Sequence, residues 1–408
     1  MPFRGAGHFS DQIFPKPLTV IYNCCLSHTA WPVPWKKEIV VPIPKKQTPN
    51  EYNDLRPTSM NPVWSKILES FIWDLTLLET KNNWKNNQHG GLKGSSTEHV
   101  LIEVWDKILR ALDKSTHNKA VVFTALDFSK SFSRCSHQKI LLAYRDVGAS
   151  SWLLQIHAAF LRERTMSVKL GIILSDPKPV TGGAVQGSVL GVLDHNVDLN
   201  NLDDELLDVH IAKYIDDMTV IDTVENKVRT NIDNSGSIPL HYIYPEFLRN
   251  AFKSISEKAT NKGLKINNDK TQLLSISSGF YETKAIIKDG NNKSIESGKE
   301  WKMLGFNFSN QPTVQAQLDM LMRKANKRFF LLLHYKRAGV GKERLRDIFC
   351  AKTRLVMEYS SNAYHSQLNN RQSNELEKIQ KRCLRLIYGY ELDYNELLKI
   401  SGLKKTQV

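Results

Sequence analysis

The chain has 408 residues, a mass of 46.7 kDa and a formal net charge of +14 at pH 7. Its length allows two or three lobes with a substantial core, and its apolar fraction of 41% is ordinary for a globular protein. It has no run of about 18 apolar residues, and its first ten residues lack the apolar segment of a signal peptide, so neither a membrane span nor secretion is expected.

The positive charge is concentrated in the last quarter of the sequence. Residues 301–408 contain 20 Lys and Arg residues and 9 Asp and Glu residues, which gives +11 of the +14. Such an excess on one lobe favours a polyanionic partner such as nucleic acid, with a membrane surface as the competing partner.

Cysteine usage indicates a reducing compartment. No Cys-x-x-Cys pair occurs among the five cysteines, so a zinc finger is not expected. We expect reduced thiols and an intracellular location, in the nucleus or the cytoplasm.

Apolar residues recur at helical spacing in three stretches near the start of the chain. They predict helices over residues 18–27, 62–78 and 100–112. A basic, proline-containing strand motif lies between the first two, at residues 42–46.

A strand pattern ending in a carboxylate comes next. Residues 121–126 form an apolar, largely β-branched or aromatic run that ends at Asp127. The sheet would fix the position of a carboxylate at the end of such a strand. Helical patterns follow from His137 and over residues 151–164.

The four residues Tyr214-Ile215-Asp216-Asp217 lie between two apolar runs and predict a β-hairpin with carboxylates at its tip. Asp favours turns in general, so this pair alone is a weak signal. Adjacent carboxylates repel each other unless a cation such as Mg²⁺ neutralises them. If the strand ending at Asp127 lies beside this hairpin, the three carboxylates can hold two Mg²⁺ ions about 3.5–4 Å apart, as in polymerases.

The remaining patterns are a polar stretch and further helices. Residues 225–237 predict a loop, and residues 252–264 an amphipathic helix. Two basic amphipathic helices follow, over residues 318–329 and 376–387. The basic face of the first includes Lys324, Lys327 and Arg328, which are either simply solvated or hold a nucleic-acid duplex by its phosphates.

Short polar and glycine-rich motifs also occur along the chain, and each one taken alone is a weak signal of function. In chain order they are Trp35 with residues 42–46, then residues 52–59, 65–69, 87–90 with 93–97, 182–191, 263–271 and 304–305. Together with the Asp127 segment and the Asp-Asp hairpin, this ordered series resembles the reverse transcriptases of non-LTR retrotransposons, especially those of jockey-like elements.

The resemblance implies an α+β, right-hand polymerase fold with fingers, an antiparallel-sheet palm and a helical thumb. We expect an N-terminal helical lead over residues 1–30, fingers over 31–117, the palm over 118–309 and a basic thumb or connection over 310–408. The implied activity is that of an RNA-directed DNA polymerase, with an RNA template, a DNA primer, deoxynucleoside triphosphates and two Mg²⁺ ions.

Roles for single residues near the nucleotide follow from the same resemblance. Phe132 would be an aromatic gate that excludes a ribose 2′-hydroxyl, with a plain core Phe as the alternative. Gln186 would face the nucleotide and the template strand. Arg56, with Lys45 or Lys46 nearby, would grip the triphosphate, because Arg matches phosphate oxygens bidentately.

Two further sites are implied. Lys270 would lie near the leaving pyrophosphate, where a cation stabilises negative charge and can donate a proton. Leu304 and Gly305 would form a primer-grip turn.

The sequence departs from the family pattern at several positions. Asp194-His195-Asn196 interrupts a helix that is normally apolar, where an unpaired buried Asp could cost several kcal/mol. Ser133, Val185 and Gly91-Leu92 also differ from the residues usual in the family. Together these differences indicate sequence drift away from the family pattern. Because intact elements of this kind also encode an upstream endonuclease, a partial or degenerate copy is expected.

Three other functions stay open. A decayed polymerase-fold remnant would bind nucleic acid without catalysis. An RNA-making polymerase with a similar palm is disfavoured by Phe132. A basic structural RNA-binding protein would not need three aligned carboxylates.

Overall fold

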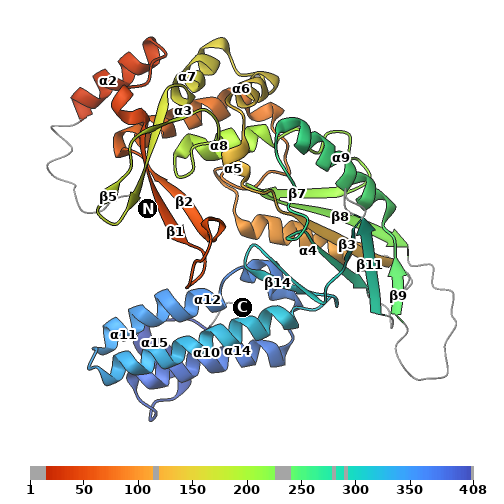
Figure 1. The fold of residues 1–408 in the computed structure, drawn as a ribbon. Coiled ribbons are helices and arrows are strands. Elements are labelled where there is room, and N and C mark those ends of the chain that lie inside the picture. The colour runs from red at the N-terminus through yellow and green to blue at the C-terminus, as the bar shows by residue number, and fades with distance from the viewer. Residues whose placement is uncertain (1–14, 114–118, 226–239, 278–281, 289–292, 406–408) are drawn as a thin grey trace.

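The computed structural model describes residues 15–113, 119–225, 240–277, 282–288 and 293–405. Two separate sheets with their covering helices form the larger part of the molecule, and a helical lobe lies opposite them (Figure 1). A β-hairpin links the central sheet to this lobe. The candidate site lies where these parts meet.

The central sheet is antiparallel, with the strand order β10-β3-β8-β7. Its strands are β3 (Lys119–Leu126), β7 (His210–Tyr214), β8 (Asp217–Glu225) and β10 (Gln272–Ser277). Both the strand before Asp127 and the hairpin at Tyr214–Asp217 are therefore confirmed.

Helices cover both faces of this sheet, which explains why β3 reads as a nearly continuous apolar run. Val121 and Phe123 pack in a core cluster with helix α4 (Thr97–Asp113). Val122 and Leu126 point to the opposite face, into a cluster that includes helix α9 (Glu246–Lys262). This alternation fixes the register of β3 and therefore the direction in which Asp127 points.

The second sheet combines strands that are far apart in the sequence. Its order is β2-β1-β4-β5, with β6 also paired to β4. The strands are β1 (Lys37–Pro44), β2 (Leu55–Met60), β4 (Arg164–Leu170), β5 (Ile173–Leu174) and β6 (Lys178–Val180). Strands β1 and β4 are parallel, with Lys37 opposite Thr165.

A buried arginine ties this second sheet together. Arg164 is 1% exposed and donates from Nε to Glu38 Oε1 at 2.7 Å. It also donates to the backbone oxygen of Phe160 at 3.2 Å and to Asn61 Oδ1 at 3.1 Å. Its guanidinium is thus satisfied by groups from three separate segments, as a buried charge requires.

Helices surround both sheets and build the C-terminal lobe. Around the sheets lie α2 (Pro15–Ser27), α3 (Val63–Thr80), α5 (Ser131–Arg134), α6 (His137–Asp146), α7 (Ser151–Leu161) and α8 (Val189–Asp198). The lobe contains α10 (Gln315–Arg337), α11 (Lys342–Ile348), α12 (Leu355–Met357), α13 (Ser361–Tyr364), α14 (Asn370–Tyr388) and α15 (Tyr394–Ser401). The remaining strands are β9 (Leu240–Ile243), β11 (Glu282–Lys288), β12 (Ser294–Glu296), β13 (Glu300–Met303) and β14 (Phe306–Ser309).

Most helices expected from periodicity are present, and the α+β class is confirmed. The helix predicted over residues 151–164 ends earlier, at Leu161, because Arg164 already begins β4. The loop predicted over residues 225–237 lies outside the described residues, except for Glu225 at the end of β8. None of the helices formed by the described residues combines the length and the apolarity needed to cross a bilayer.

We expect Arg164→Ala to lower the free energy of unfolding by about 3–5 kcal/mol, because it leaves Glu38 buried without its cation. Chemical denaturation would measure this loss. The control is Arg162→Ala, which removes an exposed arginine two residues earlier. Equal losses in the two variants would contradict a structural role for the buried pair.

Candidate active site

The hairpin between β7 and β8 is as tight as a hairpin can be. Tyr214 pairs with Asp217, so only Ile215 and Asp216 form the turn. Ile215 has a φ of +57°, in the left-handed region that a β-branched residue rarely adopts. The turn therefore needs support from outside the hairpin.

Residues 87–90 provide that support by running alongside β7. Lys213 N donates to Asn87 O at 2.8 Å, and His89 N donates to Lys213 O at 2.9 Å. The buried side chain of Gln88 then accepts two hydrogen bonds with its Oε1, from Ile215 N at 3.1 Å and from Gly90 N at 3.0 Å. Gln88 is thus a positioning residue for the turn.

Gly90 is required by the same contact. A Cβ atom at this position would lie 2.3 Å from Ile215 N, which is too close for any other residue. Neither Gln88 nor Gly90 received a role from the sequence, although both belong to the Asn-Gln-His-Gly run noted there. The sequence showed residues 87–90 only as one polar motif of the ordered series. No neighbouring residue indicated that this motif contacts the turn.

Asp127 lies next to this turn. In the pairing of β3 with β8, Leu126 is opposite Met218, so the following residue, Asp127, lies beside Asp217. The backbone oxygen of Asp127 accepts a hydrogen bond from Asn267 N at 2.7 Å, which fixes the strand end from the other side. Asp127, Asp216 and Asp217 are thus brought together from two neighbouring strands.

The three carboxylates disturb one another electrostatically. Burial, followed by the charges of Asp216 and Asp127, raises the pKa of Asp217 to about 6. Burial and the Asp127 charge also raise the pKa of Asp216, while Arg56 and Lys270 act in the opposite direction. This mutual repulsion is the property that a bound cation relieves.

The donor set fits a divalent cation of the magnesium type. All three side chains offer carboxylate oxygens, which such ions prefer. Asp127 Oδ2 is buried and accepts no hydrogen bond within the described part of the chain, and Lys270 Nζ lies 3.4 Å from it. Among those residues, no group of three or more His, Cys, Asp or Glu side chains already has the arrangement of a metal site.

A shallow hollow of about 230 Å³ extends from these carboxylates. Its lining includes Asp127, Asp217, Lys270 and Leu304, so four segments far apart in sequence meet there. Leu304 and Gly305, with φ of +46° and +85°, form the turn between β13 and β14. Tyr359 from the C-terminal lobe donates a hydrogen bond to Leu304 O and so holds this turn.

The basic residues expected at a triphosphate lie on the β1–β2 hairpin. Arg56 is exposed, and its charge lowers the pKa of Asp216. The two lysines are instead engaged within the hairpin. Lys45 Nζ donates to Asn53 O at 2.8 Å, and Lys46 forms an ion pair with Asp54 at 2.8 Å.

Phe132 lies in the short helix α5, which is hydrogen-bonded to the loop that carries Gln186. Ala184 N donates to Phe132 O at 2.7 Å. The backbone oxygen of Gln186 accepts from Ser59 N at 3.0 Å, which joins this loop to β2. Both residues are therefore held in place by backbone contacts.

A buried carboxylate anchors the helix that follows Gln186. Glu69, which is 0% exposed, accepts from Val189 N at 2.7 Å and from Leu190 N at 3.2 Å with Oε2, and from Ser65 Oγ at 2.8 Å with Oε1. A carboxylate at this point satisfies the free amides of the first turn of α8 and interacts favourably with its dipole.

The expected conflict at Asp194 is absent. Asp194 is fully buried in α8, but Tyr144 donates to its Oδ1 at 2.8 Å and His157 Nδ1 lies 3.5 Å away. Asn196 donates to Gly90 O at 2.8 Å, which connects α8 to the segment beneath the turn. Asp194 and Asn196 thus each have at least one polar partner, while Asp194 Oδ2 and Asn196 Oδ1 have none among the described residues.

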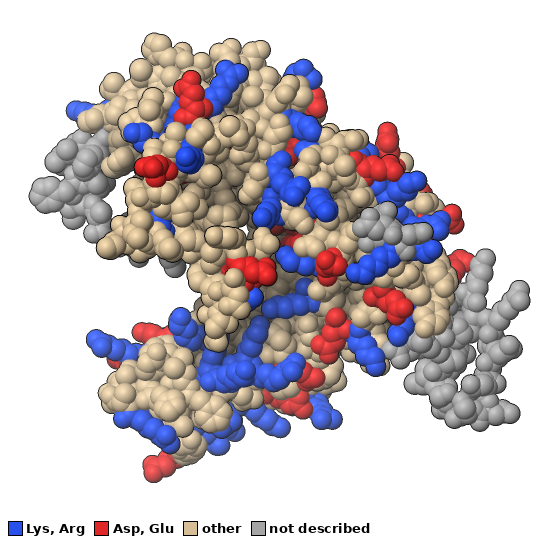
Figure 2. Space-filling view, viewed as in Figure 1, with Lys and Arg blue, Asp and Glu red and all other residues tan. Residues whose placement is uncertain are grey.

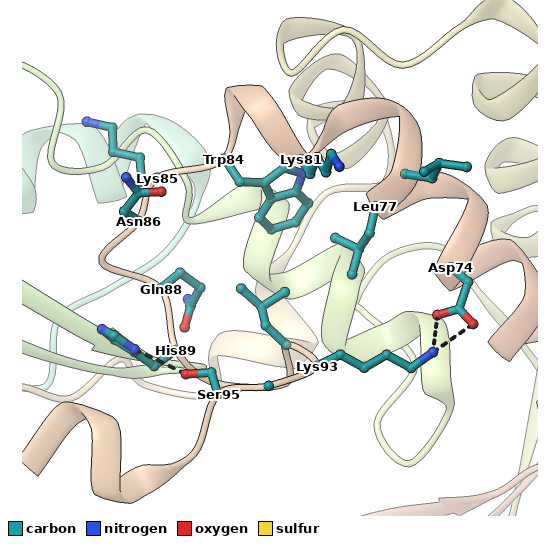
Figure 3. Close-up of a pocket in the computed structure, with 13 residues that line it drawn as sticks. Asp74, Leu77, Lys81, Trp84, Lys85, Asn86, Gln88, His89, Lys93 and Ser95 are labelled. Carbon is teal, nitrogen blue, oxygen red and sulfur yellow. Dashed lines mark hydrogen bonds and ion pairs between the residues drawn. The ribbon is translucent and has the colours of Figure 1, made fainter.

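Gln88 also borders a separate pocket of about 530 Å³ (Figure 3). Lys93 spans one side of it to reach Asp74 at 2.8 Å, and His89 contacts Ser95 at 3.1 Å. The other ring nitrogen of His89, Nε2, lies 2.7 Å from Glu103. The polar run that supports the turn is therefore itself braced from α3 and α4.

The basic residues of the C-terminal lobe border the hollow between the lobe and the sheets (Figure 2). Lys324 and Lys327 lie on the exposed surface of α10. Partial desolvation, followed by the charges of Lys302 and Arg328, lowers the pKa of Lys324. Arg328 is partly structural, because it donates to the backbone oxygen of Lys352.

Comparisons with known proteins agree on one family. A family model described as reverse transcriptase (RNA-dependent DNA polymerase) matches residues 43–308. The RNA-directed DNA polymerase from mobile element jockey of Drosophila melanogaster is 30% identical over 216 residues, which are 50% of this chain and 23% of that protein. The probable RNA-directed DNA polymerase from transposon BS of the same organism is 25% identical over 185 residues, 44% of this chain and 20% of that protein.

The chain thus spans less than a quarter of the length of these curated relatives. Among solved structures, telomerase from Candida tropicalis in complex with the TWJ fragment of telomeric RNA is 11% identical with a TM-score of 0.49. That comparison covers 95% of this chain and 67% of the telomerase chain.

The raised pKa of Asp217 predicts a pH-dependent stability. Its folded-state pKa of about 6 exceeds its ordinary value of 3.8, so the unfolded chain loses this proton first as the pH rises. Ionisation of Asp217 therefore lowers the free energy of unfolding progressively between about pH 4 and pH 6, and the full decrease is present above that range. We expect Asp217→Asn to be more stable than the parent at pH 7 but not at pH 3.5, by an amount that solvent screening reduces because Asp217 is only partly buried.

Urea unfolding at the two pH values, without divalent cations, measures this difference. Asp146→Asn, at an exposed position on α6, is the control and should show no such change. A gain of the same size at both pH values would argue against charge repulsion at the turn.

Proposed function

The chain belongs to the reverse transcriptase family, and on this basis we propose that it is the RNA-directed DNA polymerase of a non-LTR retroelement. The observation that carries the proposal is the meeting of Asp127, Asp216 and Asp217 on neighbouring strands, where burial and then the charges of the other two carboxylates raise the pKa of Asp217. A purely structural RNA-binding protein would gain nothing from this repulsion.

Asp127, Asp216 and Asp217 would hold two Mg²⁺ ions. When bound, such ions increase the acidity of a primer 3′-hydroxyl and neutralise charge on the leaving pyrophosphate. The chain contributes the fixed placement of the carboxylates. Gln88 and Gly90 hold Asp216 and Asp217 from one side, and Asn267 holds Asp127 from the other.

Cations on either side of the carboxylates would receive the triphosphate. Arg56 is exposed and close enough to influence Asp216, which suits a contact with phosphate oxygens. Lys270 pairs with Asp127 and is otherwise exposed, so it is available to stabilise the leaving pyrophosphate. Lys45 and Lys46 would contribute less directly, since both are bonded within their own hairpin.

Phe132 would act as the gate against ribonucleotides. It follows Asp127 by five residues and is half-buried, and its backbone is tied to the loop before Gln186. Gln186 would contact the nucleotide and the template from this loop. The ring of Phe132 would occupy the space that a ribose 2′-hydroxyl needs.

Leu304 and Gly305 would contact the primer end, because their turn borders the hollow that contains Asp127 and Asp217.

We propose fingers over residues 31–117, a palm over 118–309 and a thumb over 310–408. Several contacts cross the first boundary, among them the pairing of β4 with β1 and the packing of α4 on the central sheet. The fingers and palm would therefore move as closely connected parts.

Asp216→Asn tests the catalytic assignment. Primer extension on an RNA template in Mg²⁺ should fall by more than roughly 100-fold, because one carboxylate of the cation site becomes neutral. Template binding should persist. The matched control, Asp208→Asn, removes an exposed carboxylate before β7 and should extend normally.

Extension that survives in Asp216→Asn, or that proceeds in EDTA, would contradict the proposed chemistry. A parent protein that binds template and primer but never extends them would instead support the alternative of a catalytically inactive nucleic-acid-binding remnant.

Lys324→Ala combined with Lys327→Ala tests the thumb. If both lysines contact phosphates, the log–log slope of DNA-duplex affinity against salt should become less steep by about 1.8. Arg328 is left intact because of its bond to Lys352. Lys253→Ala on α9 is the control and should leave the slope unchanged. An unchanged slope in the double variant would mean that this basic face is only solvated.

A further inference from the structure

The ring of Phe132 is stacked on the ring of His195. Their centroids are 4.2 Å apart, and the ring planes differ by only 11°. Phe132 projects from the short helix α5, whereas His195 belongs to α8. One face of the Phe132 ring is thus covered by a residue that is 63 positions later in the sequence.

His195 makes no polar contact that would explain its presence. It is 0% exposed, and neither ring nitrogen has a hydrogen-bond partner among the described residues. Burial lowers the pKa of His195 to about 3, so the ring is neutral at physiological pH. Its contribution is therefore the flat surface and volume that it presents to Phe132.

The support behind His195 is rigid. Glu69 and Ser188 bind the first turn of α8, and Asp194 and Asn196 on either side of His195 are bonded to Tyr144 and to Gly90. Phe132 is less constrained, because its backbone is fixed by Ala184 but its side chain is only half-buried. A smaller residue at position 195 would leave space into which the Phe132 ring could retreat.

We propose that His195 is a positioning residue that sets how far the Phe132 ring projects toward the nucleotide sugar, and so determines the preference for deoxyribose over ribose. This inference rests on the proposed polymerase function. His195 itself touches neither the sugar nor the reacting atoms in this account.

The test compares His195→Ala with His195→Phe. The ratio of kcat/KM for GTP to that for dGTP is measured in primer extension on an RNA template. His195→Ala should raise this ratio about threefold to tenfold, which corresponds to the loss of one aromatic stacking contact. His195→Phe should keep the parent ratio and equal or exceed the parent's stability, because it retains the ring and removes two unpaired polar atoms.

His157→Ala is the matched control for general damage to this core. It removes another fully buried histidine, which is bonded to Thr76 and stacked on Tyr144. It should lower the melting temperature without changing the sugar preference. If it changes the ratio as much as His195→Ala does, the effect reflects destabilisation and the inference fails.

A double substitution separates positioning from an independent effect. In a Phe132→Ala background, His195→Ala should change the ratio little further, because the ring that it positions is gone. Fully additive effects would overturn the proposal.

Nucleotide binding keeps the test independent of turnover. A template–primer that ends in a dideoxynucleotide binds GTP or dGTP without reaction, so the affinity ratio is measured even in a protein that cannot extend. Failure of extension alone would count against the proposed function. An affinity ratio that is the same in the parent and in His195→Ala would overturn the role of His195.

Discussion

The turn that carries Asp216 combines two unfavourable features, and its support determines the arrangement of the site. Ile215 adopts left-handed backbone geometry, which costs of order 1–3 kcal/mol for a non-glycine residue. The adjacent carboxylates repel Asp127 and each other. The side chain of Gln88 offsets part of this cost by accepting hydrogen bonds from Ile215 and Gly90. Loss of this one carboxamide would leave two backbone amides without a partner at the position where the carboxylates must be held still.

Much of the central sheet was predictable because its signals are local. The β-branched run before Asp127 and the alternation around Tyr214–Asp217 follow from the burial of strands, and the fold contains both elements. The supports were not predictable, because each joins segments far apart in the chain. Gln88 and Ile215 are 127 positions apart, and Glu69 and Val189 are 120 apart. No local pattern identifies such partners.

The polar residues of α8 also have partners that the sequence does not reveal, and here the missing information made the residues look unfavourable. From the sequence, Asp194-His195-Asn196 looked like damage to an apolar helix. In the fold, Asp194 meets Tyr144 and His157, Asn196 meets the backbone of Gly90, and His195 contacts Phe132. A buried polar residue is costly only when it lacks a partner, and a sequence does not reveal the partner. Asp194 and Asn196 are therefore accommodated by polar partners, whereas His195 is accommodated by ring stacking alone and leaves both ring nitrogens without a partner among the described residues.

The parallel pairing of β1 with β4 has a consequence for biosynthesis. Glu38 and Arg164, which close this pairing, are separated by 126 residues. The β1–β2 hairpin is complete at Met60, and β4 begins at Arg164, so at a translation rate of roughly 5–20 residues per second the hairpin waits about 5–21 s for its third strand. During that time the edge of β1 is open, and an open strand edge can pair with another nascent chain. During this stretch of synthesis the polypeptide is therefore exposed to aggregation, and a chaperone that covers the edge of β1 would protect it.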